Sequence, residues 1–390
     1  MILTPHRAIL TSYFRAPAPF LTLFTGYTMS TAPWDIYAEQ LMHLGYGYPL
    51  WIPDPAPEAA QVQIGDVGWV NDGEFVPLFN APRGENDAQP RGGVPVDHVP
   101  LETRDLTIPG PRDKIWQPVL CSRSIRKVEV SGGMSASVPS SSPSCEVNFN
   151  FECTDDAGAL LFLSPSGRTQ DILSRRRILD YMETHFDHWL EFANDRLGLG
   201  LREEQIMFVS GTTKTSRWGV AAFKGKARNQ QGTVVGSFGS FASADFSMTI
   251  SDAQLSTGHY RAGPPGRATG GSAVDASCDE HDQCVFIHYY KRRKRWPFFP
   301  SVFKAAAGPH NLPRDSEASG DEELPVDWEM SSDCFSEERF ERFPHQDQVQ
   351  DPAGRVLDYI LENSNAAVAF ASDLDCFAWI ARSEKTAREI

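Results

Sequence analysis

The longest regular pattern of apolar positions starts near Gln170 and predicts one long amphipathic helix. Apolar side chains recur there at offsets of three, four and seven, which places them on one stripe at 3.6 residues per turn. They are Ile172, Leu173, Ile178, Leu179, Met182, Phe186, Trp189, Leu190, Ala193 and Leu197. Thr169 is the expected N-cap, and Gly198 and Gly200 supply the stop. A helix of about 26 residues spans about 40 Å, so its apolar face needs a sheet to cover it.

Alternation of apolar and polar residues predicts strands in much of the remaining chain. The clearest case is 145–153, where Cys, Val and Phe alternate with Glu and Asn, as in a strand with one buried face. Residues 62–70 and 74–79 predict a β-hairpin around Asn71-Asp72-Gly73, a strong turn signal. Further strands are expected at 205–211, 218–223, 284–290 and 366–371, and shorter helices at 34–44, 356–363 and 374–381.

These elements predict an α+β fold, a mostly antiparallel sheet packed against one long helix. The expected segments are a disordered N-terminal extension (1–30), an α+β globular domain (31–298), an acidic disordered insert (299–350) and a C-terminal helix–strand–helix segment that packs on the main domain (351–385). A signal or transit peptide is the alternative for the N-terminal residues, which carry three cationic side chains and no acid.

Charge and cysteine usage narrow the class of protein. The formal net charge is −15, and residues 301–390 hold 19 acids against 8 bases. Such a chain is a poor general nucleic-acid binder, because phosphate contacts need a positive surface. Seven cysteines without a C-x-x-C pair indicate a reducing compartment, cytoplasmic or nuclear. The sequence has no apolar run long enough for a transmembrane helix.

Eight short motifs are spread over 34–290 and 354–375. They are Asp35-x-Tyr37, Gly45-Tyr46-Gly47-Tyr48-Pro49-Leu50-Trp51, Ile64-Gly65-Asp66-Val67-Gly68, Leu78-Phe79-Asn80, Trp189-x-x-Phe192-Ala193, Val209-Ser210-Gly211-x-x-Lys214-Thr215-x-x-Trp218 with its continuation to Phe223, Leu357-x-Tyr359 with its continuation to Ser364, and Ala371-Ser372-Asp373. Together they resemble a protein family that is abundant in mushroom-forming fungi. The resemblance implies a shared fold and no particular chemistry.

Two loops are candidate ligand-binding segments. The stretch 211–216 is similar in composition to a phosphate loop, but it lacks the P-loop spacing and precedes a strand rather than a helix. Its Lys214, flanked by Thr213 and Thr215, is a candidate for an anionic partner, with a polar hairpin tip as the ordinary alternative. Tyr48 and Trp51 belong to an aromatic loop that could line a pocket or cap the core.

Two groups of metal-ligand residues are present, and neither completes a site. His185 and His188 lie one turn apart on the predicted long helix, where solvated histidines are the simpler interpretation. Cys278, His281 and Cys284 supply three possible zinc ligands without a fourth. We therefore expect no metal and no cofactor.

A run of five basic residues ends the predicted strand 284–290. It consists of Lys291, Arg292, Arg293, Lys294 and Arg295. Its possible roles are a nuclear localisation signal or patch for an acidic partner, contact with RNA, and pairing with the acidic segment 315–341 of the same chain. A solvated strand end is the default interpretation.

Three function classes remain open from the sequence. The first is a non-enzymatic interaction module that binds an unknown protein through its sheet surface or its charged segments. The second is an enzyme with a pocket near 46–51 and 211–216. The third is a membrane-acting, pore-forming protein, suggested by the amphipathic strand 145–153. The missing catalytic motifs and the segregated charge favour the first.

Overall fold

The fold of the chain was obtained as a computed structural model. It describes residues 7–9, 32–55, 61–90, 93–128, 145–153, 155–224, 230–238, 257–264, 281–295 and 351–378. The expected acidic insert 299–350 lies outside the described residues. Three residues of the expected N-terminal extension form strand β1 (Arg7–Ile9).

The largest sheet contains nine strands among the described residues. Its main path runs β1, β16 (Val368–Ser372), β15 (Gln283–Lys294), β11 (Met207–Thr215), β10 (Gly167–Asp171) and β5 (Arg112–Ile115). Off this path, β3 (Asp66–Asn71) pairs with β11 and β4 (Glu74–Asn80), and β2 (Tyr48–Pro49) pairs with β15. β1 runs parallel to β16, and the other pairs in this sheet are antiparallel.

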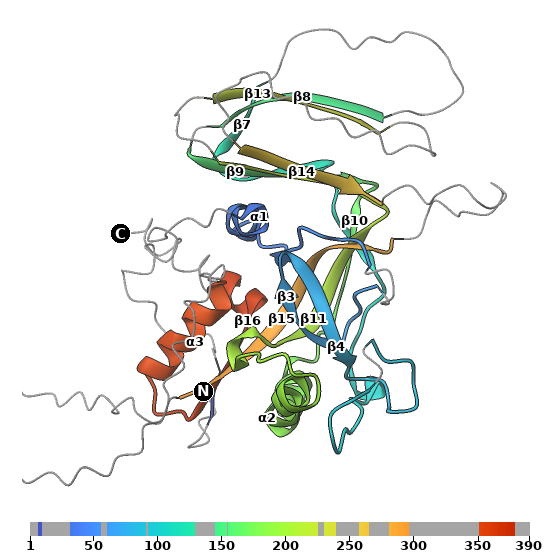
Figure 1. The fold of residues 1–390 in the computed structure, drawn as a ribbon, viewed down its shortest axis with the longest axis vertical. Coiled ribbons are helices and arrows are strands. Elements are labelled where there is room, and N and C mark those ends of the chain that lie inside the picture. Colours follow the sequence, from blue (N-terminus) through green and yellow to red (C-terminus); the bar gives the residue numbers. More distant parts are fainter. Residues whose placement is uncertain are drawn as a thin grey trace, which may run out of the picture.

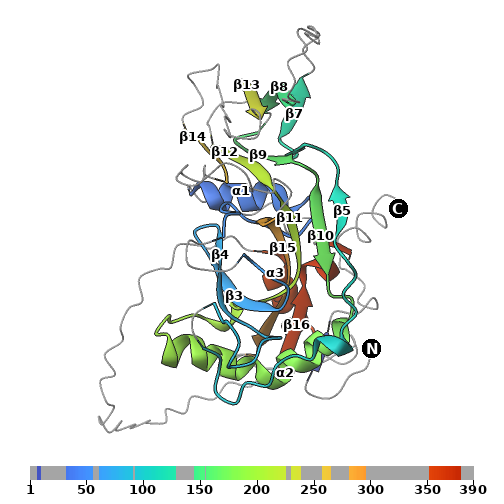
Figure 2. The ribbon, with the colours of Figure 1, turned by 90° about the vertical axis from the view of Figure 1, so that its right-hand side faces the viewer.

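Two smaller antiparallel sheets lie above the large one (Figure 1). One runs β14 (Thr257–Gly263), β12 (Arg217–Lys224), β9 (Ala157–Ser164) and β6 (Val119–Cys121). The other runs β13 (Gln230–Phe238), β8 (Cys145–Cys153) and β7 (Ile125–Val128). Helix α1 (Pro33–Met42) lies between the four-stranded sheet and the large sheet (Figure 2), and its Ile36, Tyr37 and Leu41 pack against residues of both.

Helices cover both faces of the large sheet. Because side chains alternate along a strand, Val209 and Tyr289 face one core cluster while Phe208 and Tyr290 face another. Helix α3 (Pro352–Glu362) packs in the first cluster, and α2 (Arg175–Glu191) packs in the second. The expectation of an α+β protein with antiparallel sheets is therefore confirmed.

The prediction of one long helix packed on the sheet is wrong. The α-helix α2 has 17 residues, and it continues only into a short π-helical segment, Phe192–Arg196. Its expected N-cap, Thr169, lies within β10 and is buried there. Strand pairing with Thr213 decides the conformation of Thr169, so the helix begins after Ser174. The sequence pattern predicted that one long helix covers the sheet, whereas in the structure α1, α2 and α3 each pack against part of it.

Locally encoded elements agree with their predictions. The hairpin β3–β4 turns at Asp72 and Gly73, which adopt positive φ values of 48° and 80° as its tight turn requires. Strand β8 spans the predicted residues 145–153. Residues 211–215, predicted as a turn, instead continue β11 as one strand.

We expect Trp189→Ala to destabilise the fold by about 3–5 kcal/mol, the usual loss for a large buried aromatic residue. Trp189 is fully buried, and its ring lies 6.2 Å from Phe208 and 5.9 Å from Phe79. Urea unfolding would measure the loss. Leu173→Ala, at a residue 57% exposed, is the control and should change stability by about 0.5 kcal/mol or less. A similar loss in both variants would contradict this packing.

Candidate functional site

The basic run is not a surface patch, because β15 carries it into the interior. Lys291 is 7% exposed and Arg292 is 2% exposed. The expectation of a solvated strand end is therefore wrong for these two residues. A buried charge needs a partner within hydrogen-bond reach, and each residue of the run has one. Lys291 and Arg292 therefore belong to the interior of the fold, and the remaining three residues of the run lie at its surface with partners of their own.

The partners of the run come from two parts of the chain. Arg292 bonds to Asp187 on α2, and its Nε lies 2.6 Å from Oε1 of Glu203. Lys294 also pairs with Asp187, at 2.8 Å. These contacts tie α2 and the following 3₁₀ turn, Glu203–Gln205, to β15.

The other partners belong to the C-terminal segment. Lys291 binds Asp351, which also caps the N-terminus of α3 by accepting a hydrogen bond from Gly354. Arg293 binds Asp358 within α3. Arg295 donates to main-chain carbonyls at and beyond the C-terminal end of α3, of residues Leu361, Ser364 and Ala366. A cation at this end is favoured because the last carbonyls of a helix are unsatisfied and carry partial negative charge.

The basic run pairs with acidic residues of the same chain, as one of the hypotheses from the sequence proposed. These acids include Asp187, Glu203, Asp351 and Asp358, which are not residues of the segment 315–341. The suggested acidic segment 315–341 lies outside the described residues. We call the five basic residues and their carboxylate and carbonyl partners the β15 clamp. Its effect is to hold residues 351–366 against the end of β15.

A second polar group lies further along the same strand, around His288. Its Nδ1 is 2.7 Å from Oδ2 of Asp373, and Oδ1 of Asp373 accepts the main-chain N–H of Tyr289. On the other side of the ring, Nε2 lies 3.7 Å from Oδ1 of Asp171. Lys114 binds the second oxygen of Asp171 at 2.6 Å. A row of alternating charge therefore crosses the sheet from Asp373 to the half-exposed Lys114.

Glycines make room for this row. Gly211 of β11 pairs with His288 on one side and Asp171 on the other. A Cβ at Gly211 would lie 2.3 Å from Oδ1 of Asp171, and one at Gly47 would lie 3.3 Å from Nδ1 of His288. The absence of these two side chains lets the carboxylate and the imidazole approach each other across the middle strand.

The pKa of His288 is set by two opposing effects. Burial lowers it, but the nearby carboxylates of Asp373 and Asp171 outweigh burial, so that the pKa is raised above its ordinary value of 6.5. The imidazolium form is therefore favoured between its two carboxylates. Oδ1 of Asp171 is buried without a hydrogen bond, which leaves the Nε2 side of the ring as the looser end of the row.

The predicted ligand loops flank the same strand but mostly supply core residues. β2 and β11 lie on opposite edges of β15. Tyr48 and Trp51 are buried in core clusters, while Thr213 bonds to Thr169 and Thr215 bonds to Pro165. Of the five candidates, Lys214 alone is not fully buried, and its Nζ donates to Gln61 at 2.7 Å.

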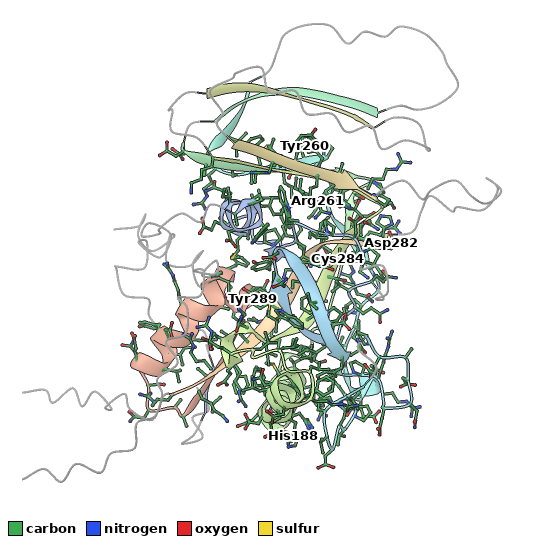
Figure 3. The ribbon with its side chains drawn as sticks, viewed as in Figure 1. His188, Tyr260, Arg261, Asp282, Cys284 and Tyr289 are labelled. Atoms are coloured by element: carbon green, nitrogen blue, oxygen red, sulfur yellow. The ribbon has the colours of Figure 1, made fainter. Side chains whose placement is uncertain are left out.

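Neither predicted metal-ligand group forms a site in the described part of the chain. Cys278 lies outside the described residues. Burial raises the pKa of Cys284 to about 12, which disfavours the thiolate that binds zinc. His188 lies on α2, at the end of the molecule opposite the two smaller sheets and away from Cys284 (Figure 3). Among the described residues no group of three or more His, Cys, Asp or Glu side chains is placed to hold a metal ion.

Neither His288 nor Asp373 was among the functional residues predicted from the sequence. Two signals pointed to them: a histidine in the middle of the apolar run 284–290, and a polar Ser-Asp pair directly after the apolar strand 366–371. An ionisable residue inside a buried strand requires a partner, but its identity depends on strand order, which the local pattern does not encode.

Comparison with models of known families, with curated proteins and with solved structures gives no match. The resemblance to a fungal family therefore stays a prediction. Within the part of the chain that the structure describes, no helix combines the length and the apolar character needed to cross a membrane.

We expect the contribution of His288 to stability to fall as pH rises. Because its folded pKa is above 6.5, its contribution is fully present below pH 6.5 and is lost as pH rises through the folded pKa. The difference in unfolding free energy between the wild type and His288→Gln should therefore be largest below pH 6.5 and shrink as pH rises above it. Urea unfolding at each pH measures it, with the exposed His259→Gln as control. A difference that grows with pH would refute the assignment.

We expect Gly211→Ala to cost about 1–3 kcal/mol, because the new methyl group overlaps the Asp171 carboxylate. A matched control is Gly110→Ala, since a Cβ at Gly110 meets no atom within 4 Å. Thermal unfolding of the two variants compares them. Equal stability would show that Asp171 moves away without cost, and that the row tolerates a side chain between its members.

Proposed function

We propose that the protein is a non-enzymatic interaction module that presents its acidic segment, residues 299–350, to a basic protein partner. The β15 clamp carries this proposal. It fixes the chain on both sides of the acidic segment to one strand, because Arg295 directly follows the last residue of β15 and Asp351 binds Lys291, four residues before Arg295. Four residues of a strand span about 13 Å. The acidic segment therefore leaves and re-enters the folded body at neighbouring points.

The sequence of the segment supports a role in binding. It holds twelve acidic residues against four basic ones, and among them lie Trp328, Phe335, Phe340 and Phe343. Acidic side chains provide long-range attraction to a basic partner and raise the association rate. Aromatic side chains provide apolar contact area once the partner is bound.

The clamp also argues against the other charged candidate for the contact. A partner that used the basic run 291–295 would compete with the carboxylates and carbonyls that already hold it. Removing one member of a buried ion pair costs about 3–5 kcal/mol, so the run is poorly suited to exchange partners. Of the two charged segments predicted from the sequence, the acidic segment is therefore the better suited to an external contact.

The enzyme alternative has one observation in its favour. The segments 46–51 and 211–216, which contribute to β2 and β11, flank β15 next to His288, whose pKa is raised. However, His288 is 4% exposed and is held by Asp373 and Asp171. Since four of the five predicted ligand residues are core residues, the geometry supports the module better. The pore-forming alternative stays a prediction.

Binding to a lysine-rich peptide at several salt concentrations would test the proposal. We expect the triple variant Asp321→Asn, Glu322→Gln, Glu323→Gln to weaken binding and to reduce its salt dependence, because screened charge–charge attraction is lost. The matched control changes the same number of exposed acids on the folded body: Glu85→Gln, Asp97→Asn and Glu102→Gln. Equal weakening by both triples would mean that net charge alone drives binding, and the proposal would fail.

A further inference from the structure

Lys214 differs from the other lysines whose hydrogen bonds the structure defines. The sequence contains nine lysines. Lys114, Lys291 and Lys294 each bind a carboxylate. The Nζ of Lys214 instead donates to the uncharged side-chain amide of Gln61, at 2.7 Å. None of the ion pairs within the described residues involves Lys214.

Three groups oppose the effect of burial on the pKa of Lys214, namely Cys284, Asp66 and Asp282. Asp282 accepts a hydrogen bond from the side chain of Gln283. The register partner of Lys214 on β15 is Cys284, whose pKa burial raises to about 12, so the thiol is uncharged at neutral pH. The nearest acid on β3 is Asp66, and its oxygens accept hydrogen bonds from the main-chain N–H of Gln63 and from Asn80, at 2.7 and 2.8 Å. This carboxylate is therefore directed to other donors.

Burial and weak compensation have a chemical consequence for the amine. Burial lowers the pKa of Lys214, and the negative groups nearby oppose this only in part. A buried lysine with a lowered pKa keeps a larger fraction of its molecules as the neutral amine. The neutral amine has the free electron pair that makes lysine a nucleophile toward carbonyl groups.

We propose that Lys214 is a covalent attachment site for small aldehydes, set apart from the other lysines by its amide partner Gln61 and its uncharged neighbour Cys284. The Nζ electron pair attacks the carbonyl carbon and a C–N bond forms. The carbonyl oxygen then leaves as water with the two protons of the amine, and an imine remains. No oxidant or further reactant is needed. The side chain is half-buried, which restricts the site to small carbonyl compounds. The site does not depend on the acidic segment.

Reductive labelling of the full chain tests the proposal. The protein is incubated with acetaldehyde and cyanoborohydride at a series of pH values below the ordinary lysine pKa of about 10.4, and the rate at each lysine is read by peptide mass spectrometry. At pH 7 Lys214 should react faster than Lys114, because burial lowers the pKa of Lys214 and leaves a larger fraction of its amine neutral. Lys214→Arg should remove the fast adduct, and Lys114→Arg should leave it unchanged.

A second variant separates a reactive amine from a merely exposed one. Gln61→Glu replaces the amide by a carboxylate of the same size, which should raise the pH midpoint of Lys214 labelling and slow its reaction at pH 7. Circular dichroism checks that this variant folds, and labelling in urea should abolish the preference. A Lys214 rate at or below that of Lys114, or an unchanged midpoint in Gln61→Glu, would overturn the proposal.

Discussion

The structure depends on the burial of β15, a strand whose first half is apolar and whose second half is basic. Its 12 residues pair with β11 in the apolar half, with β16 in the basic half and with β2 at Phe286 and Ile287, and Lys291 and Arg292 of the basic half are buried. Ions in such a position are costly unless each meets a partner of opposite charge. The carboxylates that meet this need belong to α2, to the 3₁₀ turn after it and to the C-terminal segment. Their positions relative to the sheet follow from the charges of one strand.

This constraint links the two faces of the sheet. α2 and α3 lie on opposite faces and share no core cluster, yet both are bonded to neighbouring residues of the basic run. Arg292 reaches toward α2, and its guanidinium lies 4.2 Å from the ring of Phe186. Lys291 reaches toward Asp351 on the other face. Successive side chains of a strand point to opposite faces of the sheet. The neighbouring cations Lys291 and Arg292 therefore reach acids at two different helices.

Features decided by near neighbours in the sequence could be predicted, and features decided by distant partners could not. The hairpin at Asp72-Gly73 and the strand 145–153 were predicted because turn chemistry and alternation act within a few residues. Thr169 failed as a helix cap because Thr213, 44 residues away, pairs with it in the sheet. The apolar pattern of the predicted helix begins with Ile172 and Leu173, which lie between the end of β10 and the start of α2, because a few apolar positions do not distinguish a helix from the segment before it.

In the candidate site, too, the partners of the residues lie far away in the sequence and could not be predicted. Lys214 was identified from its own flanking sequence, but its partner Gln61 lies 153 residues away. Asp373 is 85 residues from His288, and no local pattern connects them. What the sequence does show is that an ionisable residue in an apolar run needs a partner. Which residue provides it depends on strand order and register.

Arg295 directly follows β15, and Asp351 is bound to Lys291 of the same strand. This arrangement has a consequence for engineering and for the evolution of the protein. When two chain ends are already held together, the entropy of closing the connection grows slowly with its length, by about 0.6 kcal/mol for each doubling. The junction between β15 and α3 is therefore expected to tolerate inserted segments of different length. A foreign folded domain with adjacent termini could be grafted there, and natural insertions of very different length could have accumulated there, with little change to the body that carries them.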